Sequence, residues 1–365
     1  MYFIKVLLKN QFIFNKNVKF VKNISGDFMK HEVDLSKYSI RTDLAIDVCE
    51  KDFINDIYNT DGISVSSINL DSEKASSIFK KPGNYITISF SDVTDSVNRD
   101  KVKSVFSAQL VDLFNRISIG SGDYCLVVGL GNYKSTPDSL GPVSVDRVTV
   151  TNHLYLLGSL DEGFRRVSCI NPGVTGVTGI ETSDIIRSVV DKIEPDFLIV
   201  IDALASSSLE RVNKTIQITD TGIHPGSGIG NSRKEISVDT IGKPVIAIGV
   251  PTTVDAVTIV SDTINFMEKH FSYAKKNIDN PINKLIVGGV NYLNKDVTVS
   301  DSDKSELLGL VGSLDEIEVR KLVSEVLTPV GYNFMVTPKE IDFVISKLSE
   351  VLGDGINMAL HEKLR

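Results

Sequence analysis

The segment Phe197–Ala205 constrains the fold of this chain more than any other. Its first five residues are apolar and lead directly to one carboxylate, Asp202. An uninterrupted apolar run of this length is typical of a strand buried on both faces, as in parallel sheets. Open parallel sheets carry functional groups at the carboxyl ends of their strands. We therefore expect Asp202 on the floor of a crevice, where loss of solvent raises a carboxyl pKa unless a partner compensates.

A second segment has the same order of features. The apolar run 124–130 leads into a glycine turn and then to Asp138. Two carboxylates at two strand ends are what a paired acid–base site requires. The structural alternatives are a helix cap for Asp138 and, for Asp202, the cap of a helix that begins at Ala203.

The order of elements along the chain predicts an α/β fold. Buried runs at 166–170 and 243–250 add to the two strands above and alternate with helical patterns, which indicates a mainly parallel twisted sheet flanked by helices. Residues 84–92 and 213–220 alternate apolar and polar side chains, typical of exposed or half-exposed strands. They suggest a smaller β-containing subdomain that includes about 205–240. Helices are expected at 97–117, 182–193, 255–276, 315–327 and 338–351.

The bulk properties exclude several classes of protein. The net charge of -8 over 365 residues argues against direct nucleic-acid binding, which favours basic surfaces. No apolar run reaches the roughly 18 residues that a membrane helix needs. Lysines interrupt the apolar residues of the first 28 positions, so a secretory signal is not expected either. These features predict a cytoplasmic protein.

The first 28 residues raise a separate question. The stretch Gly26-Asp-Phe before Met29 can be encoded by purine-rich codons of the kind found in a bacterial ribosome-binding site. Our hypothesis is that Met29 is the native start and that residues 1–28 are a translated leader. The alternative is a genuine short extension.

The glycine-rich loop that begins at His224 is the candidate substrate loop. Its candidate residues are His224, Gly226, Gly228 and Asn231. Glycines let a neighbouring backbone approach closely, and free N–H groups of such a loop can hold an extended peptide. The spacing Gly226-Ser-Gly228 differs from that of a nucleophile elbow.

No cofactor is predicted from the remaining motifs. The pair Gly129 and Gly131 lacks the third glycine of a dinucleotide fingerprint. The triplet that begins at Asp220 is the Asp-Thr-Gly of all-β aspartic proteases, but the α/β pattern favours a turn residue there. The alternative for the site is a single divalent metal held by Asp138, Asp202 and His224.

Several long motifs of the chain form a recognisable set. They lie at 129–142, 171–182, 201–205, 215–233, 249–252, 335–342 and 352–361. Together they resemble the germination protease family of spore-forming Firmicutes. The departures from the family pattern are small, namely Ser139, Asn171 and the residues before Met29, and none falls on the proposed carboxylates.

The resemblance implies an endopeptidase that initiates the degradation of small acid-soluble spore proteins during germination. It further implies a homotetramer, made as a zymogen in the forespore and kept in the spore core. The sheet is expected to be similar to that of the hydrogenase-maturation peptidases, in which two acids and a histidine hold a metal. The family is instead regarded as aspartic-type, so the resemblance assigns catalysis to Asp138 and Asp202 without a cofactor.

Residues 38–47 resemble the self-cleavage region of the same family. An acid is followed by an aliphatic residue and an alanine, as in the spore-protein targets, and we predict a cut between Asp43 and Leu44. Residues 1–43 would then be leader and propeptide, and 44–365 the peptidase domain.

Two alternatives remain at this point. The first is a metal-dependent peptidase of the maturation type that uses Asp138, Asp202 and His224. The second is a non-enzymatic peptide-binding protein in which the glycine loop grips an extended peptide and the carboxylates are only caps.

Overall fold

A computed structural model describes most of the chain after the first 41 residues. All the described residues belong to one compact unit, Tyr38–Arg365. The proposed leader and nearly all of the proposed propeptide therefore lie outside the described residues. The description covers 42–365 except for 50–52, 227–232, 278–297, 310 and 328–333.

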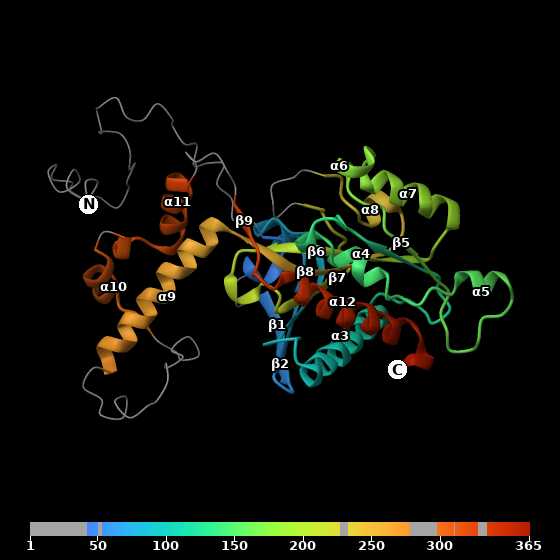
Figure 1. The fold of residues 1–365 in the computed structure, drawn as a ribbon, viewed down its shortest axis with the longest axis horizontal. Coiled ribbons are helices and arrows are strands. Elements are labelled where there is room, and N and C mark those ends of the chain that lie inside the picture. The colour runs from blue at the N-terminus through green and yellow to red at the C-terminus, as the bar shows by residue number, and fades with distance from the viewer. Residues whose placement is uncertain (1–41, 50–52, 227–232, 278–297, 310, 328–333) are drawn as a thin grey trace. The chain divides into compact units, whose positions relative to one another are not determined.

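A mixed sheet forms the centre of this unit (Figure 1). In the described residues it has nine strands in the order β1-β2-β3-β7-β8-β6-β4-β5, with β9 beside β8. The strands are β1 (Ile54–Thr60), β2 (Ile63–Leu70), β3 (Gly83–Ser89), β4 (Cys125–Gly129), β5 (Val167–Ile170), β6 (Phe197–Ser206), β7 (Thr215–Thr219), β8 (Val245–Asp255) and β9 (Met335–Val336).

The expectation of an α/β fold is confirmed, but the sheet is mixed rather than mainly parallel. Strands β8, β6, β4 and β5 pair in parallel, and these are the four runs expected to be buried strands. The other neighbouring pairs of the described sheet are antiparallel. Strands β1 and β2 carry no strong apolar run, which is why the sequence pattern missed them.

Strand β7 corrects a second expectation. Its alternating residues predicted an exposed strand in a smaller layer, yet all five are buried. The strand lies between β3 and β8 in the one sheet, and both of its faces are covered. Ile216 and Ile218 pack in the core that contains α3 and α12. On the other face, Gln217 binds Asp43 and Ala45. A separate subdomain over about 205–240 stays a prediction.

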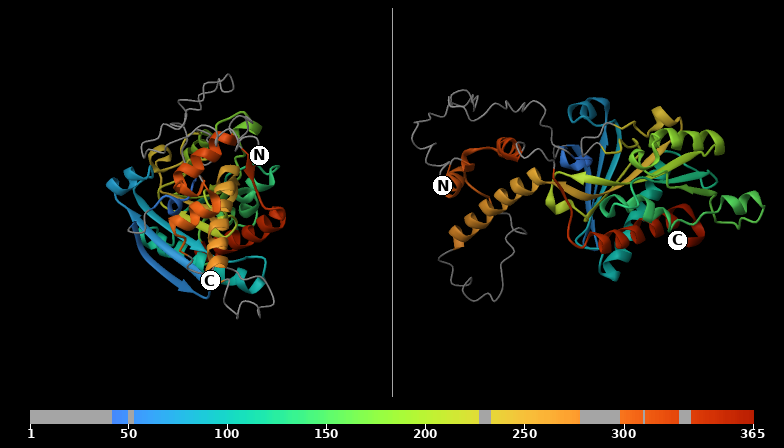
Figure 2. Two further views of the ribbon diagram at one scale, coloured as in Figure 1. Left: turned by 90° about the vertical axis from the view of Figure 1, so that its left-hand side faces the viewer. Right: turned by 45° about the horizontal axis from the view of Figure 1, so that its top comes forward.

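Helices cover both faces of the sheet (Figure 2). Helices α3 and α12 pack against each other, and α10 and α11 pack on α9. Among the described helices, none has both the length and the apolar character that crossing a membrane requires. The helices are α2 (Ser72–Ser77), α3 (Ser96–Arg116), α4 (Leu140–Val145), α5 (Asn152–Leu156), α6 (Thr175–Thr178), α7 (Thr182–Ile193), α8 (Val238–Ile241), α9 (Ala256–Asn277), α10 (Asp301–Leu308), α11 (Glu316–Leu327) and α12 (Ile341–Leu360).

Strand β6 sends its side chains alternately into two cores. Ile199 and Ile201 pack in the core that contains α3 and α12, whereas Leu198 and Val200 pack in the core that contains α7. Because side chains alternate along a strand, Asp202 has the same parity as Leu198 and Val200. It therefore continues a row of fully buried aliphatic side chains.

Candidate active site

Asp202 lies within β6 rather than at its end. The strand continues to Ser206 because β8 pairs with it over this whole length, with an irregularity after Leu204. No helix begins at Ala203, so the helix-cap alternative is wrong. The Asp202 side chain is only 5% exposed, and its Oδ1 accepts a hydrogen bond from the backbone N–H of Ala203 at 2.9 Å.

Asp138 closes the turn that follows β4. It ends the 3-10 helix η4 (Thr136–Asp138), and both its Oδ2 and its carbonyl oxygen accept from the backbone N–H of Asn132, at 2.9 and 3.0 Å. Its side chain does not cap α4. From β8, the Thr252 hydroxyl donates to the carbonyl of Pro137 at 2.8 Å and thereby anchors η4 to the sheet.

Two glycines allow this turn to press against the ends of the strands. Gly131 has a φ of +119°, and a Cβ there would lie 1.9 Å from the carbonyl oxygen of Asp138. At Gly141 a Cβ would lie 2.2 Å from the Leu130 carbonyl oxygen and 2.6 Å from that of Ile201. Only residues without a side chain bring the turn, β4 and β6 this close.

The pKa values of both carboxyl groups are raised, and Asp138 contributes to the shift of Asp202. Burial raises the pKa of Asp202 well above its ordinary value, and the negative charges of Asp138 and Asp43 raise it further. Burial also raises the pKa of Asp138. The Arg233 guanidinium opposes both shifts by favouring the ionised forms. Desolvation therefore dominates both shifts.

The proposed self-cleavage region lies beside this pair. The Asp43 charge is close enough to act on Asp202, and Leu44 is fully buried. Asp43 is hydrogen-bonded to Ala205 near the end of β6, with its Oδ2 2.9 Å from the Ala205 nitrogen. The structure therefore brings Asp43, Asp138 and Asp202 into one region.

The glycine-rich loop is described only in part. His224 and Gly226 are described, whereas Gly228 and Asn231 fall in the undescribed segment 227–232. The His224 side chain is about half exposed, with its Nε2 3.3 Å from Oε2 of Glu235. A role of this loop in substrate binding stays a prediction.

The proposed metal ligands do not gather. Among the described residues, no group of three or more His, Cys, Asp and Glu side chains has an arrangement that could hold a metal ion. Asp138, Asp202 and His224 are all described, so they do not form such a group. These three residues therefore do not fit the metal that the alternative hypothesis requires.

Asp220 acts as a structural residue in this arrangement. Its two carboxylate oxygens accept from the backbone N–H and the side-chain amide of Asn84, at 2.8 and 2.6 Å. It thereby ties the end of β7 to the beginning of β3, in agreement with the turn expected from its sequence.

Sequence reasoning missed four residues that shape this region. Arg233 and Thr252 stand in motifs that carry the family resemblance, which was the available signal for them. Lys80 contacts the carbonyl oxygen of Asp43, and Gln217 contacts the same residue from β7. Gln217 stands in the motif 215–233 as well, whereas nothing in the sequence pattern singled out Lys80.

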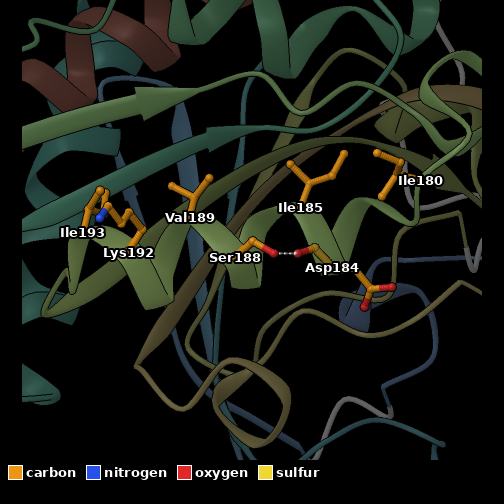
Figure 3. Close-up of a pocket in the computed structure, with 7 residues that line it drawn as sticks. All are labelled: Ile180, Asp184, Ile185, Ser188, Val189, Lys192 and Ile193. Atoms are coloured by element: carbon orange, nitrogen blue, oxygen red, sulfur yellow. Dashed lines mark hydrogen bonds between the residues drawn. The ribbon is translucent and has the colours of Figure 1, made fainter.

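A separate shallow hollow lies along α7 (Figure 3). Its aliphatic side chains point along one side of the helix, and Ser188 donates to the backbone carbonyl of Asp184. None of the candidate site residues lines it. Its lining consists of Ile180, Asp184, Ile185, Ser188, Val189, Lys192 and Ile193.

Two neighbouring carboxyl groups of raised pKa on an α/β sheet are an arrangement that hydrolytic enzymes use for acid–base chemistry, and this class of protein is the one that the fold and the site favour. The comparison with known families is more specific. The family model of the germination proteases matches residues 41–365, and the chain belongs to this family. It is a peptidase of the kind that acts in spore germination.

Relatives of similar length support the assignment. The chain is 45% identical to the germination protease of Bacillus cereus strain AH187 and 46% identical to that of Bacillus cereus strain ATCC 10987. It is 45% identical to that of Bacillus mycoides strain KBAB4. Each comparison covers 92% of this chain and 97% of the relative. The alternative of a non-enzymatic peptide-binding protein is therefore wrong.

Proposed function

We propose that this peptidase is made as a zymogen, cuts itself between Asp43 and Leu44, and then initiates the degradation of small acid-soluble spore proteins. The proposal is supported by membership of the family and by one observation above all. The acidic residue before the proposed cut lies beside the two candidate carboxylates, close enough to raise the pKa of Asp202.

The two carboxylates divide the chemistry between them. Asp202 is the more deeply buried and holds the shared proton, because its charged form is the more costly one. Asp138 is the ionised member and accepts a proton from the attacking water, while Asp202 donates to the carbonyl of the scissile bond. The positive charge of Arg233 favours the ionised form of both acids. Asp138, whose pKa is raised less, is the one that ionises first.

The remaining parts of the proposal concern the setting of the enzyme. The substrate is a protein, the assembly is a homotetramer, and the site of action is the cytoplasm of the spore. A tetramer would show in light scattering as a mass about four times the 40.0 kDa of one chain. The likeness of the sheet to that of the hydrogenase-maturation peptidases stays a prediction.

The decisive experiment is the intact mass of the purified chain before and after a shift to mildly acidic pH, with Asp202→Asn alongside. We expect the wild type to lose everything before Leu44 and the variant to stay whole, because an amide cannot supply the shared proton. The variant should also fail to cut an added spore protein. A folded Asp202→Asn chain that still processes itself would contradict the assignment.

Two controls separate the alternatives. Asp220→Asn changes a carboxylate of the same region whose partners are structural, and we expect it to retain self-cleavage. A chelator tests the metal alternative. Activity that is lost with the chelator and restored by one divalent ion would favour that alternative over the two-carboxylate mechanism.

A further inference from the structure

The segment around the proposed cut is bonded to β6, with Leu44 in an extended conformation directly before the 3-10 helix η2 (Ala45–Asp47). The backbone N–H of Asp43 donates to the carbonyl of Ala205 at 3.0 Å, and the N–H of Ala205 donates back to Oδ2 of Asp43 at 2.9 Å. Farther on, the Asp47 carboxylate accepts from the N–H of Ser207 at 2.9 Å and pairs with Arg211 at 2.7 Å. The bond after Asp43 is therefore fixed from both sides.

Two side chains converge on the carbonyl oxygen of Asp43. Lys80 Nζ lies 3.0 Å from it, and Gln217 Nε2 lies 3.5 Å from it. Oε1 of the same glutamine accepts from the backbone N–H of Ala45 at 2.7 Å. The Gln217 amide thus binds the carbonyl before the proposed cut and the N–H two residues later.

This pattern is that of a strand residue in a parallel ladder. Such a residue donates to one carbonyl of its neighbour and accepts from the N–H two residues farther along. Gln217 is only 6% exposed, and a buried amide needs partners for both of its ends. The backbone groups of Asp43 and Ala45 are these partners, so the contact does not depend on the side chain of Leu44.

Lys80 adds charge to the same point. Its ammonium also lies 3.5 Å from the carbonyl of Thr42. Burial lowers the pKa of Lys80, and the charges of Asp43, Asp47 and Cys49 oppose that shift. The electrostatic attraction between a half-buried ammonium and a carbonyl oxygen is stronger than in solvent, because water screens it less.

We propose that Lys80 and Gln217 bind and polarise the carbonyl oxygen of Asp43 and thereby select the Asp43–Leu44 bond for self-cleavage. The inference rests on the proposed function and adds two residues to it. Partial negative charge develops on this oxygen as water attacks the carbonyl and before the proton of Asp202 is fully transferred, and donors already in place stabilise that charge. Removing one such donor in other enzymes costs about 100-fold or more in rate.

The test is the rate of self-processing in Lys80→Met and Gln217→Met, followed by intact mass. We expect each variant to process at least about 10-fold more slowly than the wild type, and Lys80→Arg to recover part of the rate. The residual cuts should spread to bonds next to Asp43–Leu44, because the carbonyl is no longer fixed. A purely structural role would not move the position of the cut.

Matched controls are available on α3. Lys103 pairs with Asp100 on the surface of this helix, and Gln109 donates to the hydroxyl of Tyr58. Lys103→Met and Gln109→Met should process at the wild-type rate. Melting of every variant in the uncut Asp202→Asn background shows whether it folds.

The outcomes distinguish the two levels of the proposal. A wild type that never cuts itself contradicts the proposed function. A wild type that cuts itself while Lys80→Met and Gln217→Met cut equally fast at the same bond overturns the inference alone. A purely structural effect would also overturn it. The variants would then cut slowly and melt at a lower temperature, the cut would stay at the Asp43–Leu44 bond, and Lys80→Arg would recover none of the rate.

Discussion

At the scale of single residues, the site depends on the free energy that an ionised carboxylate loses when it is buried away from water. Asp202 continues a row of buried aliphatic side chains on β6 and receives a backbone N–H from Ala203. One hydrogen bond does not replace the hydration that an ionised carboxylate loses. The protonated form is therefore favoured, which is the state a proton donor needs.

The same burial makes a prediction about stability. Between the ordinary carboxyl pKa of about 3.9 and the raised pKa of Asp202, the folded protein holds a proton that the unfolded chain releases. The free energy of unfolding therefore falls as the pH rises through this window. The amide of Asp202→Asn does not ionise, so the variant does not lose stability as the pH rises. We therefore expect its melting temperature at pH 7 to lie at least about 3 °C above that of the wild type.

Melting curves between pH 4 and pH 8 measure this effect. The advantage of Asp202→Asn should shrink toward the acidic end, where both states of the wild type are protonated. Asp161→Asn is a suitable control, because that carboxylate lies on the surface and pairs with Lys363. An advantage that is absent, or that grows as the pH falls, would contradict the buried-carboxylate interpretation.

At the scale of elements, the turn between β4 and α4 sets the position of Asp138. Gly131 adopts a φ of +119°, and its missing side chain makes room for the Asp138 carbonyl. Gly131→Ala is expected to shift the turn and to reduce proteolysis about 100-fold, since small displacements of a reacting group are costly. Rates of self-processing and of substrate cleavage measure the loss.

A second glycine supplies the control for this prediction. Gly158 also has a positive φ, of +67°, but a Cβ there meets no atom within 4 Å. Gly158→Ala therefore carries the backbone strain of such a conformation, about 1 kcal/mol, without the clash. Equal losses of activity in both variants would show that strain alone, rather than the place of Asp138, is responsible.

The elements also show how far the sequence could lead. The buried strands β4, β6 and β8 were predictable because a short, unbroken apolar run rich in β-branched residues strongly favours a strand covered on both faces. Strand β7 was misjudged because its threonines and Gln217 look solvent-facing in the sequence, whereas the fold buries all five residues and places Asp43 and Ala45 against Gln217. The end of β6 was misplaced because a carboxylate within a buried strand contradicts the usual pattern, as functional sites often do.

At the scale of the site, motif resemblance named Asp138 and Asp202 as candidates, but it could not predict the residues that surround them. Lys80 follows α2 and Gln217 lies on β7, far apart in sequence, and only the folded sheet brings both to Asp43. Long-range pairing of this kind leaves no periodic signal. Arg233 was visible as part of a motif but gained a role only from its proximity to both acids.

At the scale of the whole molecule, the contacts of the proposed cleavage region favour self-processing within one chain, if the proposed function holds. Asp43 is held by Ala205 and Asp47 by Ser207, all in the same chain as the two carboxylates. An intramolecular reaction has a half-time that does not depend on concentration. We therefore expect the same half-time across an about 100-fold range of dilution.

Mixing two chains tests this prediction directly. An isotopically labelled Asp202→Asn chain, which cannot process itself, is incubated with the wild type and both masses are followed. Within one chain, Asp43 is already bonded to Ala205 of β6 and Leu44 is buried, so we expect the site of the same chain to reach the bond after Asp43 first. The labelled chain should stay whole while the wild type is cut, and its cleavage at a rate proportional to wild-type concentration would show that processing occurs between molecules.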